Sequence, residues 1–478
     1  MHRVLAALLC LFAADAAAQT PSPPGATTTW TLRDWTRVEM WRFFEPPDGG
    51  GNDDYAFLAN RLFAGVQRAA PAYDLTAALQ YVQFGGLPRD AVGPGPLGTG
   101  AVYYAQAGHS DSRQLYLRYA NLRLKRLVPS TSIQIGRMPY SSGGEAPSGN
   151  PKIEAVKLQR VAARLIGEFE WSIYQRAYDG VRVDTTRRRW TVTAFAVHPT
   201  QGGFEDAAGL MMPDVTVAGG AVTVTSAASS PSVQYQAFAY LYRDTRKVTQ
   251  RPDNTGRGAQ AIDVGIDTFG GSIIVAPPVA RSRQWDGLVW VAAQSGSWYE
   301  LRHRAASVAI EGGHQWMMPH WQPWLRGGFL YASGDGNPSD DRHGTLFEML
   351  PTVRRYAQTA LYSQMNNTDL FAQLLAKPRS QITLRLDAHR VGLASSRDGW
   401  YYGSGATQQH GSIFGFATRP SFGATNLATI GEGSVDYAFA PHWSVNGYLA
   451  LGRGGGVVTP AFAGHTLTFA YVENVFQF

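Results

Sequence analysis

The feature that most constrains this chain is a two-residue alternation of apolar and polar side chains that recurs at intervals along it. The alternation is clearest over residues 73–81, 381–389 and 443–451. Successive side chains of a β-strand point to opposite faces, so each of these segments has one apolar and one polar face. In a soluble sandwich the polar face lies outside, whereas in a membrane barrel it lines a wet lumen and the apolar face meets lipid.

Composition narrows the choice between these folds. Only 16% of the residues are charged, 52 of the 478 are glycine, and 12% are aromatic. Beyond the first twenty residues, no apolar run approaches the roughly 18 residues that a membrane-spanning helix needs, which excludes a helical membrane protein. A hydrophobic content of 44% excludes a disordered chain. We therefore expect an all-β fold, a transmembrane antiparallel β-barrel.

The amino terminus has the pattern of an export signal. A short polar start at His2 and Arg3 precedes the apolar stretch Val4–Ala14 and the small residues Ala16–Ala18. This pattern predicts a signal peptide over residues 1–18, a flexible leader over 19–29 and a single barrel domain over 30–478. The chain's one cysteine, Cys10, lies in the predicted signal, so the exported chain has no disulfides or thiolate metal ligands.

Strand number and orientation follow from the same pattern. About seventeen segments qualify as strands, and because bacterial barrels use an even number we expect eighteen, with one strand before residue 300 unassigned. The terminal Phe478, on an alternating strand, resembles the assembly signal of outer-membrane barrels. Short turns at Ala440–His442 and Lys377–Arg379 are expected on the periplasmic side. The long connections are expected outside: Gly85–Asp111, Thr200–Pro231, Ser333–Thr368 and Ser395–Phe422.

Aromatic residues cluster at the ends of candidate strands, which predicts interfacial girdles. These residues are Trp30, Trp41, Phe43, Trp316, Trp321, Trp324, Trp400, Tyr401 and Tyr402.

Two of the long connections are candidates for gating. Long loops in compact proteins are usually functional or disordered, so we expect the 85–111 or the 333–368 loop to fold over or into the mouth of the barrel. Surface decoration is the alternative. Tyr103 and Tyr104 are candidates for stacking on sugar rings.

One segment departs from the two-residue period. Apolar residues between Leu158 and Phe169 recur at spacings of three and four, which predicts a helix. Arg160, Arg164 and Glu168 share its opposite face. The helix either packs as an ordinary surface helix on a loop or lines the lumen and narrows the pore.

Several motifs in a fixed order resemble those of a known family. From about residue 35 to the C-terminus, the chain is similar to the alginate export family of outer-membrane porins. The resemblance implies a monomeric barrel of eighteen strands with an Arg-lined pore that passes an anionic polysaccharide. The motifs are Gly136-Arg137, Arg164–Phe169, Arg176–Arg182, Ser333–Asn337 with Asp340, Gly344–Phe347, Leu350-Pro351, Asp387 with His389, and Asp398–Tyr401.

Strand parity predicts where the arginines point. Arginine supplies 37 of the 42 cations, and a charge on the lipid face costs about 2–4 kcal/mol at the midplane. Inward placement is therefore expected even for an arginine with no role in transport. Arg137 has the wrong parity unless a bulge at Gly136 or the end of the strand re-aims it. The candidate pore-lining residues are Arg61, Arg118, Arg137, Arg160, Arg164, Arg176, Arg182, Arg326 and Arg385, with Glu168, Asp179 and Asp387 as acidic partners.

The sequence contains no motif that supports an enzymatic function. The chain has no Gly-x-Ser-x-Gly, His-Glu-x-x-His or phosphate-loop motif. Gly93–Gly98 matches a dinucleotide fingerprint literally, but its two prolines forbid the strand-to-helix turn, so we interpret it as a loop. Asp335, Asp340 and Asp341 are better explained as solvated turn acids than as calcium ligands. We expect no enzymatic activity, no cofactor and no metal site.

The sequence thus predicts a porin of the bacterial outer membrane with an anion-selective channel for export of an alginate-like polysaccharide. The expected partners are an anionic polysaccharide or other anionic solute, outer-membrane lipid and periplasmic export components, without nucleic acid. Two alternatives stay open: an uptake porin for small anions, and a carbohydrate-active or carbohydrate-binding β protein of the envelope.

Overall fold

The computed structural model describes residues 25–93, 99–226, 232–352, 358–359 and 361–478. The expected signal peptide and the first part of the expected leader lie outside the described residues. The first strand, β1, already begins at Thr27. The last three residues of the expected leader therefore belong to the barrel.

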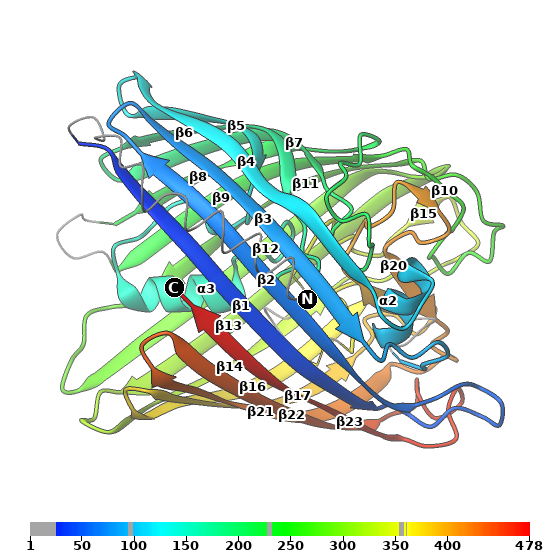
Figure 1. Cartoon of the computed structure of the whole chain (residues 1–478). Helices are drawn as coiled ribbons and strands as arrows, with labels where there is room; N and C mark the ends of the chain where they lie inside the picture. The colour runs from blue at the N-terminus through cyan, green and yellow to red at the C-terminus, as the bar shows by residue number, and fades with distance from the viewer. Residues whose placement is uncertain (1–24, 94–98, 227–231, 353–357, 360) are drawn as a thin grey trace.

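Eighteen of the strands in the described residues form one closed antiparallel barrel, because β1 pairs with both β2 and the last strand, β23 (Figure 1). The expected fold class and strand number are confirmed. The barrel strands are β1 (Thr27–Arg42), β2 (Asp54–Ala69), β3 (Tyr73–Gly85), β4 (Arg113–Val128), β5 (Thr131–Met138), β6 (Tyr178–Arg187), β7 (Trp190–Pro199), β8 (Val215–Thr225), β9 (Val233–Asp244), β11 (Val264–Val275), β12 (Arg283–Trp298), β13 (Leu301–Trp316), β14 (Trp321–Ala332), β16 (Asn367–Arg379), β17 (Ile382–Gly392), β21 (Asn426–Ala440), β22 (Trp443–Gly454) and β23 (Thr466–Gln477).

The strand missing from the sequence analysis is β8. It lies inside the connection that was expected to run from Thr200 to Pro231, so that expectation is wrong, and the long loop there spans only residues 200–214. The reason is local: Gly219 and Gly220 interrupt the alternation in the middle of β8, and Gly219 adopts a positive φ of 147°. The turn expected at Lys377–Arg379 also shifts, because β16 continues to Arg379.

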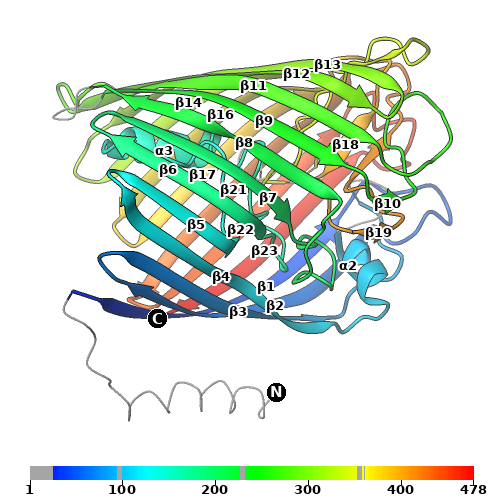
Figure 2. The ribbon, with the colours of Figure 1, turned by 90° about the horizontal axis from the view of Figure 1, so that it is seen from above.

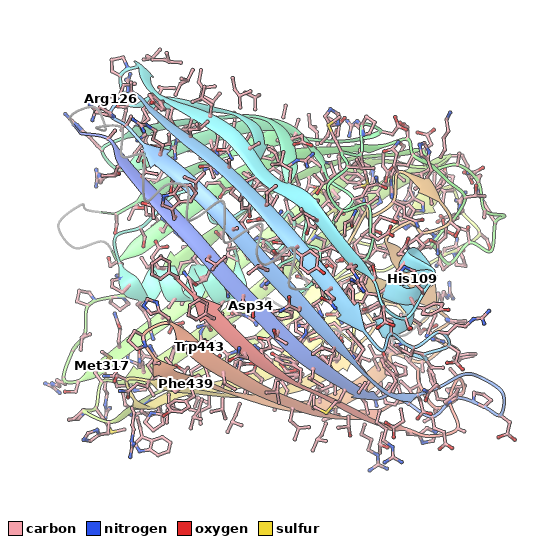
Figure 3. The ribbon with its side chains drawn as sticks, viewed as in Figure 1. Asp34, His109, Arg126, Met317, Phe439 and Trp443 are labelled. Carbon is pink, nitrogen blue, oxygen red and sulfur yellow. The ribbon has the colours of Figure 1, made fainter. Side chains whose placement is uncertain are left out.

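The alternating faces behave as a membrane barrel requires. On β17, Leu386 is 59% exposed on the outer wall, whereas the next residue, Asp387, is 5% exposed on the inner side. Exposed tryptophans mark the end of the barrel that has short turns: Trp30, Trp190, Trp285, Trp321 and Trp443. Phe439 and Trp443 lie together at this end in Figure 3.

Several aromatic residues that were expected in the interfacial girdles do not lie there, so that part of the prediction is wrong. Trp41, Phe43, Trp324, Trp400 and Tyr401 are all buried. These side chains point into the barrel or into its loops, where they pack against other parts of the chain. Proximity to a strand end in the sequence does not show which face a ring occupies.

Two segments fill part of the lumen. Residues 139–177, between β5 and β6, pass down the inside of the barrel to its short-turn end, where the helix α3 (Pro151–Arg160) lies (Figures 1 and 2). They meet the connection between β14 and β16: the Gly167 amide donates to the Leu350 carbonyl at 2.8 Å, and the Leu350 amide donates to the Leu165 carbonyl at 2.9 Å.

The other end of the barrel carries the long loops (Figure 2). The helix α2 (Thr99–Ala107) buries Tyr103 against Phe84, Tyr174 and Phe204. The described part of the 85–111 loop packs over the mouth of the barrel, and the chain around Leu350 of the 333–368 loop enters the lumen, which matches the placement expected of at least one loop. Tyr103 is covered and does not present a face to a sugar ring. The short loop strands are β10 (Lys247–Val248), β15 (Arg342–His343), β18 (Trp400–Gly403), β19 (His410–Gly411) and β20 (Phe416–Arg419).

The helix expected over residues 158–169 is displaced. Asn150 caps α3 by accepting from the amides of Lys152 and Ile153, with a proline at the first turn, and the helix ends at Arg160. The chain then turns through Ala163 at a φ of 60° and becomes extended where it meets Leu350. The apolar residues after Arg160 are buried by this pairing rather than by a helical face. No helix in the described residues is long and apolar enough to cross a membrane.

Candidate functional site: the charged lumen

A group of buried side chains with an excess of positive charge lies in the lumen where α3 meets β12, β13 and β14. We call this group the cationic cluster. Arg160 Nε donates to both Glu311 oxygens at 2.9 Å, and Arg326 Nε donates to Asp286 Oδ1 at 3.0 Å. The cationic cluster consists of Lys152, Arg160, Arg164 and Arg326 with the carboxylates of Asp286 and Glu311.

Four cations thus share two carboxylates, and every one of these side chains is at least 95% buried. Aromatic rings contribute to their solvation: Lys152 Nζ lies 3.4 Å from the centroid of Trp324, and the Arg160 guanidinium carbon lies 4.1 Å from that of Phe371. Burial lowers the pKa of the Lys152 ammonium to about 8, and the Asp286 carboxylate opposes this shift.

A cavity of about 310 Å³ opens beside the cationic cluster at the short-turn end of the barrel. Lys152 and Lys377 line it together with Trp324 and four glutamines. None of the described residues that line this cavity is acidic. Its electrostatic character is therefore positive, and Lys152 belongs both to the cavity and to the cationic cluster.

A second cavity, of about 320 Å³, lies against β1, β2 and β23. Arg33 and Arg61 line it, but so do Glu170 and Glu473. The rings of Trp35, Trp171 and Tyr471 complete its wall. Its charge is mixed rather than positive.

Three of the expected arginines attach the inner segments to the wall and to the loops. Arg61 donates to the Ser172 carbonyl at 3.1 Å, and Arg118 donates to the Arg176 carbonyl and pairs with Glu168. Arg176 is not on a strand; its guanidinium donates to the carbonyls of Leu350 and Ser404. A bulge in β4 at Arg118 also turns Tyr119 toward Glu168.

Two further expected arginines pair with nearby acids. Arg182 Nη2 donates to Asp184 Oδ1 at 2.8 Å within β6. Arg137 pairs with Asp179, which lies directly opposite it on β6, through contacts of 2.8 and 2.6 Å.

Arg137 and Asp179 stand apart from the lumen. Gly136 has a φ of 111°, but the pairing of β4 with β5 runs through it without a register shift, so Arg137 keeps the parity of the exposed Ile135. Its guanidinium donates to the carbonyls of Leu117 and Gly209. Because β5 ends at Met138, Arg137 holds the 200–214 loop against an edge of β4 that has no partner from β5.

The remaining expected pair, Arg385 and Asp387, belongs to a group that we call the acidic cluster. Arg385 Nε donates to Asp387 Oδ2 at 2.7 Å. Three residues that sequence reasoning did not select join them, and the register of β16, β17 and β21 brings them together. The acidic cluster consists of Asp369, Asp387 and Glu432 with Arg385 and His389.

The acids of the 333–368 loop do not converge on one point. Asp335 is buried, whereas Asp341 is exposed and pairs with Arg302 at 2.6 Å. Asp340 accepts from the Arg342 amide at 2.8 Å. Asp340 and Asp341 are therefore solvated turn acids, as the sequence analysis interpreted them, whereas for Asp335 the expected solvation is wrong because the side chain is buried.

Comparison with known proteins identifies the family. A family model for alginate export matches residues 47–448, which is most of the chain. The chain belongs to the alginate export family. No curated protein is detectably similar to it in sequence.

Solved structures of outer-membrane proteins share the fold. OccK5 (OpdH) of Pseudomonas aeruginosa matches with a TM-score of 0.53 at 8% identity, over 95% of this chain and 98% of its own. OccAB1 of Acinetobacter baumannii matches with 0.54 at 8%, over 96% and 99%. OpdK of Pseudomonas aeruginosa, in a structure with vanillate, matches with 0.54 at 7%, over 94% and 98%. At such identities the likeness shows the fold alone.

Family and barrel together make this chain a porin-like channel protein of the bacterial outer membrane. In such barrels the short turns face the periplasm and the long loops face outward. The cavity beside the cationic cluster therefore lies at the periplasmic end.

Proposed function

We propose that this family member is a passive, monomeric, anion-selective channel that exports an anionic polysaccharide of the alginate type from the periplasm, and not an enzyme. The observation that carries the proposal is the cationic cluster, with four cations to two carboxylates, beside a periplasmic cavity lined by two lysines. Its partners are the polymer, the lipid around the barrel and periplasmic components that deliver the polymer.

The electrostatic argument depends on position. Fixed charges between low-dielectric walls focus their field on whatever passes. A polyanion that approaches from the periplasm meets the Lys152 and Lys377 ammonium groups that line the cavity, and behind them the field of the buried Arg160 and Arg326. The carboxylates along the polymer thus enter a region of favourable potential at the end of the barrel where export begins.

The inner segments bear on conduction. Residues 139–177 and the chain around Leu350 occupy lumen volume, and Arg118 and Arg176 hold them in place through carbonyl contacts. We infer that displacement of these segments sets the conductance.

Planar-bilayer recording tests this function. In a KCl gradient at low salt, the reversal potential is expected to report anion preference, and oligouronates added on the periplasmic side are expected to block the current. Neutral oligosaccharides of equal length serve as the matched control. Cation preference at low salt, or equal block by both sugars, would reject the proposal.

Uptake of small organic anions is a second candidate. The cavity of about 310 Å³ falls in the range of small-ligand pockets, and OpdK, which shares the fold, was solved with vanillate. Block by monomeric carboxylates without block by oligouronates would favour this second function.

A further inference from the structure

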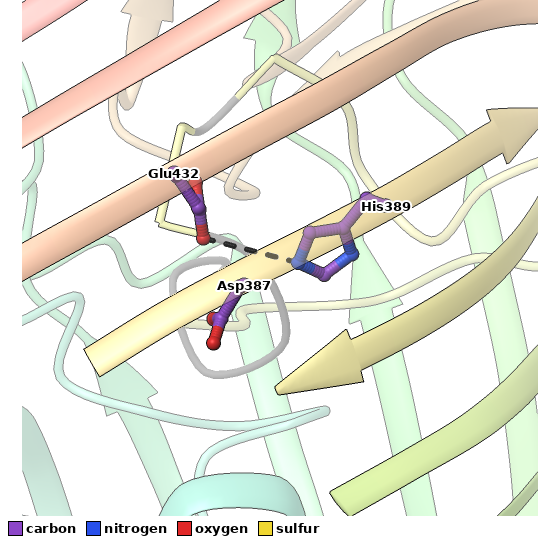
Figure 4. A group of neighbouring side chains, drawn as sticks. All are labelled: Asp387, His389 and Glu432. Carbon is purple, nitrogen blue, oxygen red and sulfur yellow. Dashed lines mark ion pairs between the residues drawn. The ribbon is translucent and has the colours of Figure 1, made fainter. Parts of the chain in front are cut away.

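The acidic cluster contains a geometry that neither transport nor folding explains. Asp387 and His389 lie on the inner face of β17, and Glu432 lies on the neighbouring strand β21 (Figure 4). One carboxylate oxygen or ring nitrogen from each of the three lies within 4.8 Å of the others. All three side chains are buried.

The imidazole of His389 is held in one orientation. Its Nδ1 lies 3.0 Å and 3.1 Å from the two carboxylate oxygens of Asp369 on β16. The other ring nitrogen, Nε2, therefore points at Glu432, 3.9 Å from Oε1. A carboxylate behind one nitrogen of a histidine, with the second nitrogen aimed at a common point, is the arrangement that orients metal-binding histidines.

The atoms aimed into this point lack hydrogen-bond partners. His389 is 3% exposed, yet its Nε2 has no hydrogen-bond partner among the described residues, and neither has Oδ1 of the buried Asp387. Buried polar atoms in folded proteins are nearly always paired, so these two atoms are available to a bound ion. In the tautomer that carries its proton on Nδ1 and donates it to Asp369, Nε2 offers a lone pair on the side of Asp387 and Glu432, as a metal ligand must.

The net charge of the acidic cluster also favours a bound cation. When a metal ion takes the place of the second ring proton of His389, Asp369, Asp387 and Glu432 contribute three negative charges and Arg385 one positive charge, so the side chains of the acidic cluster sum to minus two. Uncompensated charge in a buried site is expensive. One divalent cation brings this cluster to neutrality.

We propose that Asp387, His389 and Glu432 bind one divalent transition-metal ion, with Zn²⁺ as the representative. This departs from our sequence-based expectation of no metal site. An imidazole with two carboxylates suits zinc, with water in the fourth position. Calcium prefers six to eight oxygen ligands, so it fits this set poorly.

Such an ion would fasten the inner chain to the wall. Glu432 also accepts from the Gln358 amide at 2.9 Å, and Asp369 accepts from the Tyr362 hydroxyl at 2.9 Å. Both donors belong to the connection between β14 and β16 that enters the lumen. The metal orders the carboxylates that hold this connection, and Asp369 acts as a positioning residue.

Metal titration of the full-length protein tests the proposal. The protein is purified in detergent, treated with a chelator and titrated with Co²⁺, whose visible absorption reports nitrogen and oxygen coordination, and with Zn²⁺ against a chromophoric chelator. We expect one equivalent of either ion to bind, and His389→Gln or Glu432→Gln to weaken binding at least tenfold. Asp369→Asn, which removes only the positioning carboxylate, is expected to weaken it by about 10–100-fold.

The matched control is His314→Gln, which changes a histidine of outward parity on β13 and should leave binding unchanged. Heat-modifiable gel mobility verifies that each variant folds. Failure of the wild-type protein to bind one equivalent of Zn²⁺ or Co²⁺ would overturn the site whatever the variants do. Binding that survives both His389→Gln and Glu432→Gln, or Ca²⁺ binding as tight as Zn²⁺ binding, would also overturn it. Anion selectivity is measured separately and does not depend on this result.

Discussion

The cationic cluster and the acidic cluster are neighbours on one wall of the barrel, yet they carry opposite charge. A single ring separates them: Phe371 lies 4.1 Å from the Arg160 guanidinium and stacks against His389 with ring centroids 5.9 Å apart. The cationic cluster receives three of its four cations from the segment that enters the lumen, whereas the acidic cluster is built from wall strands alone. The sign of the lumen is therefore set locally by what the inner segment adds to the wall.

This comparison also separates two ways of satisfying a buried charge. In the cationic cluster every carboxylate has more than one cation, and rings cover the excess. In the acidic cluster Arg385 reaches one carboxylate oxygen of Asp387, and within the part of the chain that the structure describes His389 Nε2 and Asp387 Oδ1 have no hydrogen-bond partner. In the cationic cluster, Nη1 and Nη2 of Arg326 likewise lack hydrogen-bond partners among the described residues, although they lie within ion-pair distance of Glu311 and Asp286. The two clusters therefore differ in the sign of their excess charge, and not in whether every buried polar atom is satisfied.

The largest expected effect comes from breaking the cationic cluster at Arg326, the one of its cations that belongs to the wall. Arg326 contacts Asp286 at 3.0 Å and Glu311 at 3.3 Å, so Arg326→Met leaves both carboxylates short of a buried partner. We expect the free energy of unfolding to fall by about 3–5 kcal/mol, measured by denaturant titration in micelles. Arg302→Met, which breaks an exposed pair with Asp341, should cost less than about 1 kcal/mol. Equal losses of unfolding free energy in Arg326→Met and Arg302→Met would contradict the prediction that the buried ion pairs of Arg326 stabilise the fold more than the exposed pair of Arg302.

A second expected effect concerns selectivity. Removing both ammonium groups of the periplasmic cavity, in the double variant Lys152→Gln and Lys377→Gln, should lower the anion-to-cation permeability ratio at least about twofold in low salt. The difference should shrink at high salt as screening grows. Lys247→Gln, at an exposed residue of β10 at the extracellular end, is the control and should change the ratio little. An unchanged permeability ratio in the double variant would show that the two lysines of the cavity do not determine the ion selectivity of the channel.

A third test acts on the acidic cluster. In chelator-treated protein, Asp387→Asn removes one negative charge and releases Arg385 from its carboxylate. We expect a rise in anion preference, smaller than the fall produced by the lysine double variant, because Arg385 and Asp387 already cancel each other. The measurement is again the reversal potential in a KCl gradient, and a shift toward cations would show that the local sum of charges does not control the lumen.

Much of the wall was predictable from the sequence, because alternation fixes which side of a strand a residue faces. The inward placement of Asp387 and His389 follows directly from their alternation with the outward apolar residues Leu386 and Ala388. The positions of Arg61, Arg118 and Arg326 follow in the same way. Strand β8 was not predicted because the two glycines at its centre lack the side chains on which the alternating pattern depends.

The partners of these residues were not predictable. Arg160 meets Glu311 only because the 139–177 segment descends into the lumen, and no periodicity encodes that path. His389 meets Glu432 through the register of β17 with β21, which depends on the length of the loop between them. An inward histidine two residues after an inward aspartate was the one sequence signal for this site, and it became specific only beside Glu432.

The smallest expected effect is a pH dependence of anion preference that arises from Lys152 in the cationic cluster and not from the acidic cluster. Because burial holds the pKa of Lys152 at about 8, its ammonium is charged below that pH and loses its proton as the pH rises through it. Anion preference at low salt should therefore decline between about pH 7 and pH 9, where arginines stay charged. Lys152→Arg keeps the charge throughout this range, so its preference should stay flat, while Asp387→Asn should decline in parallel with the wild type. Reversal potentials are measured at pH 7, 8 and 9 for the wild type and the two variants. If the anion preference of Lys152→Arg also declined with pH, the titrating group would lie outside the cationic cluster.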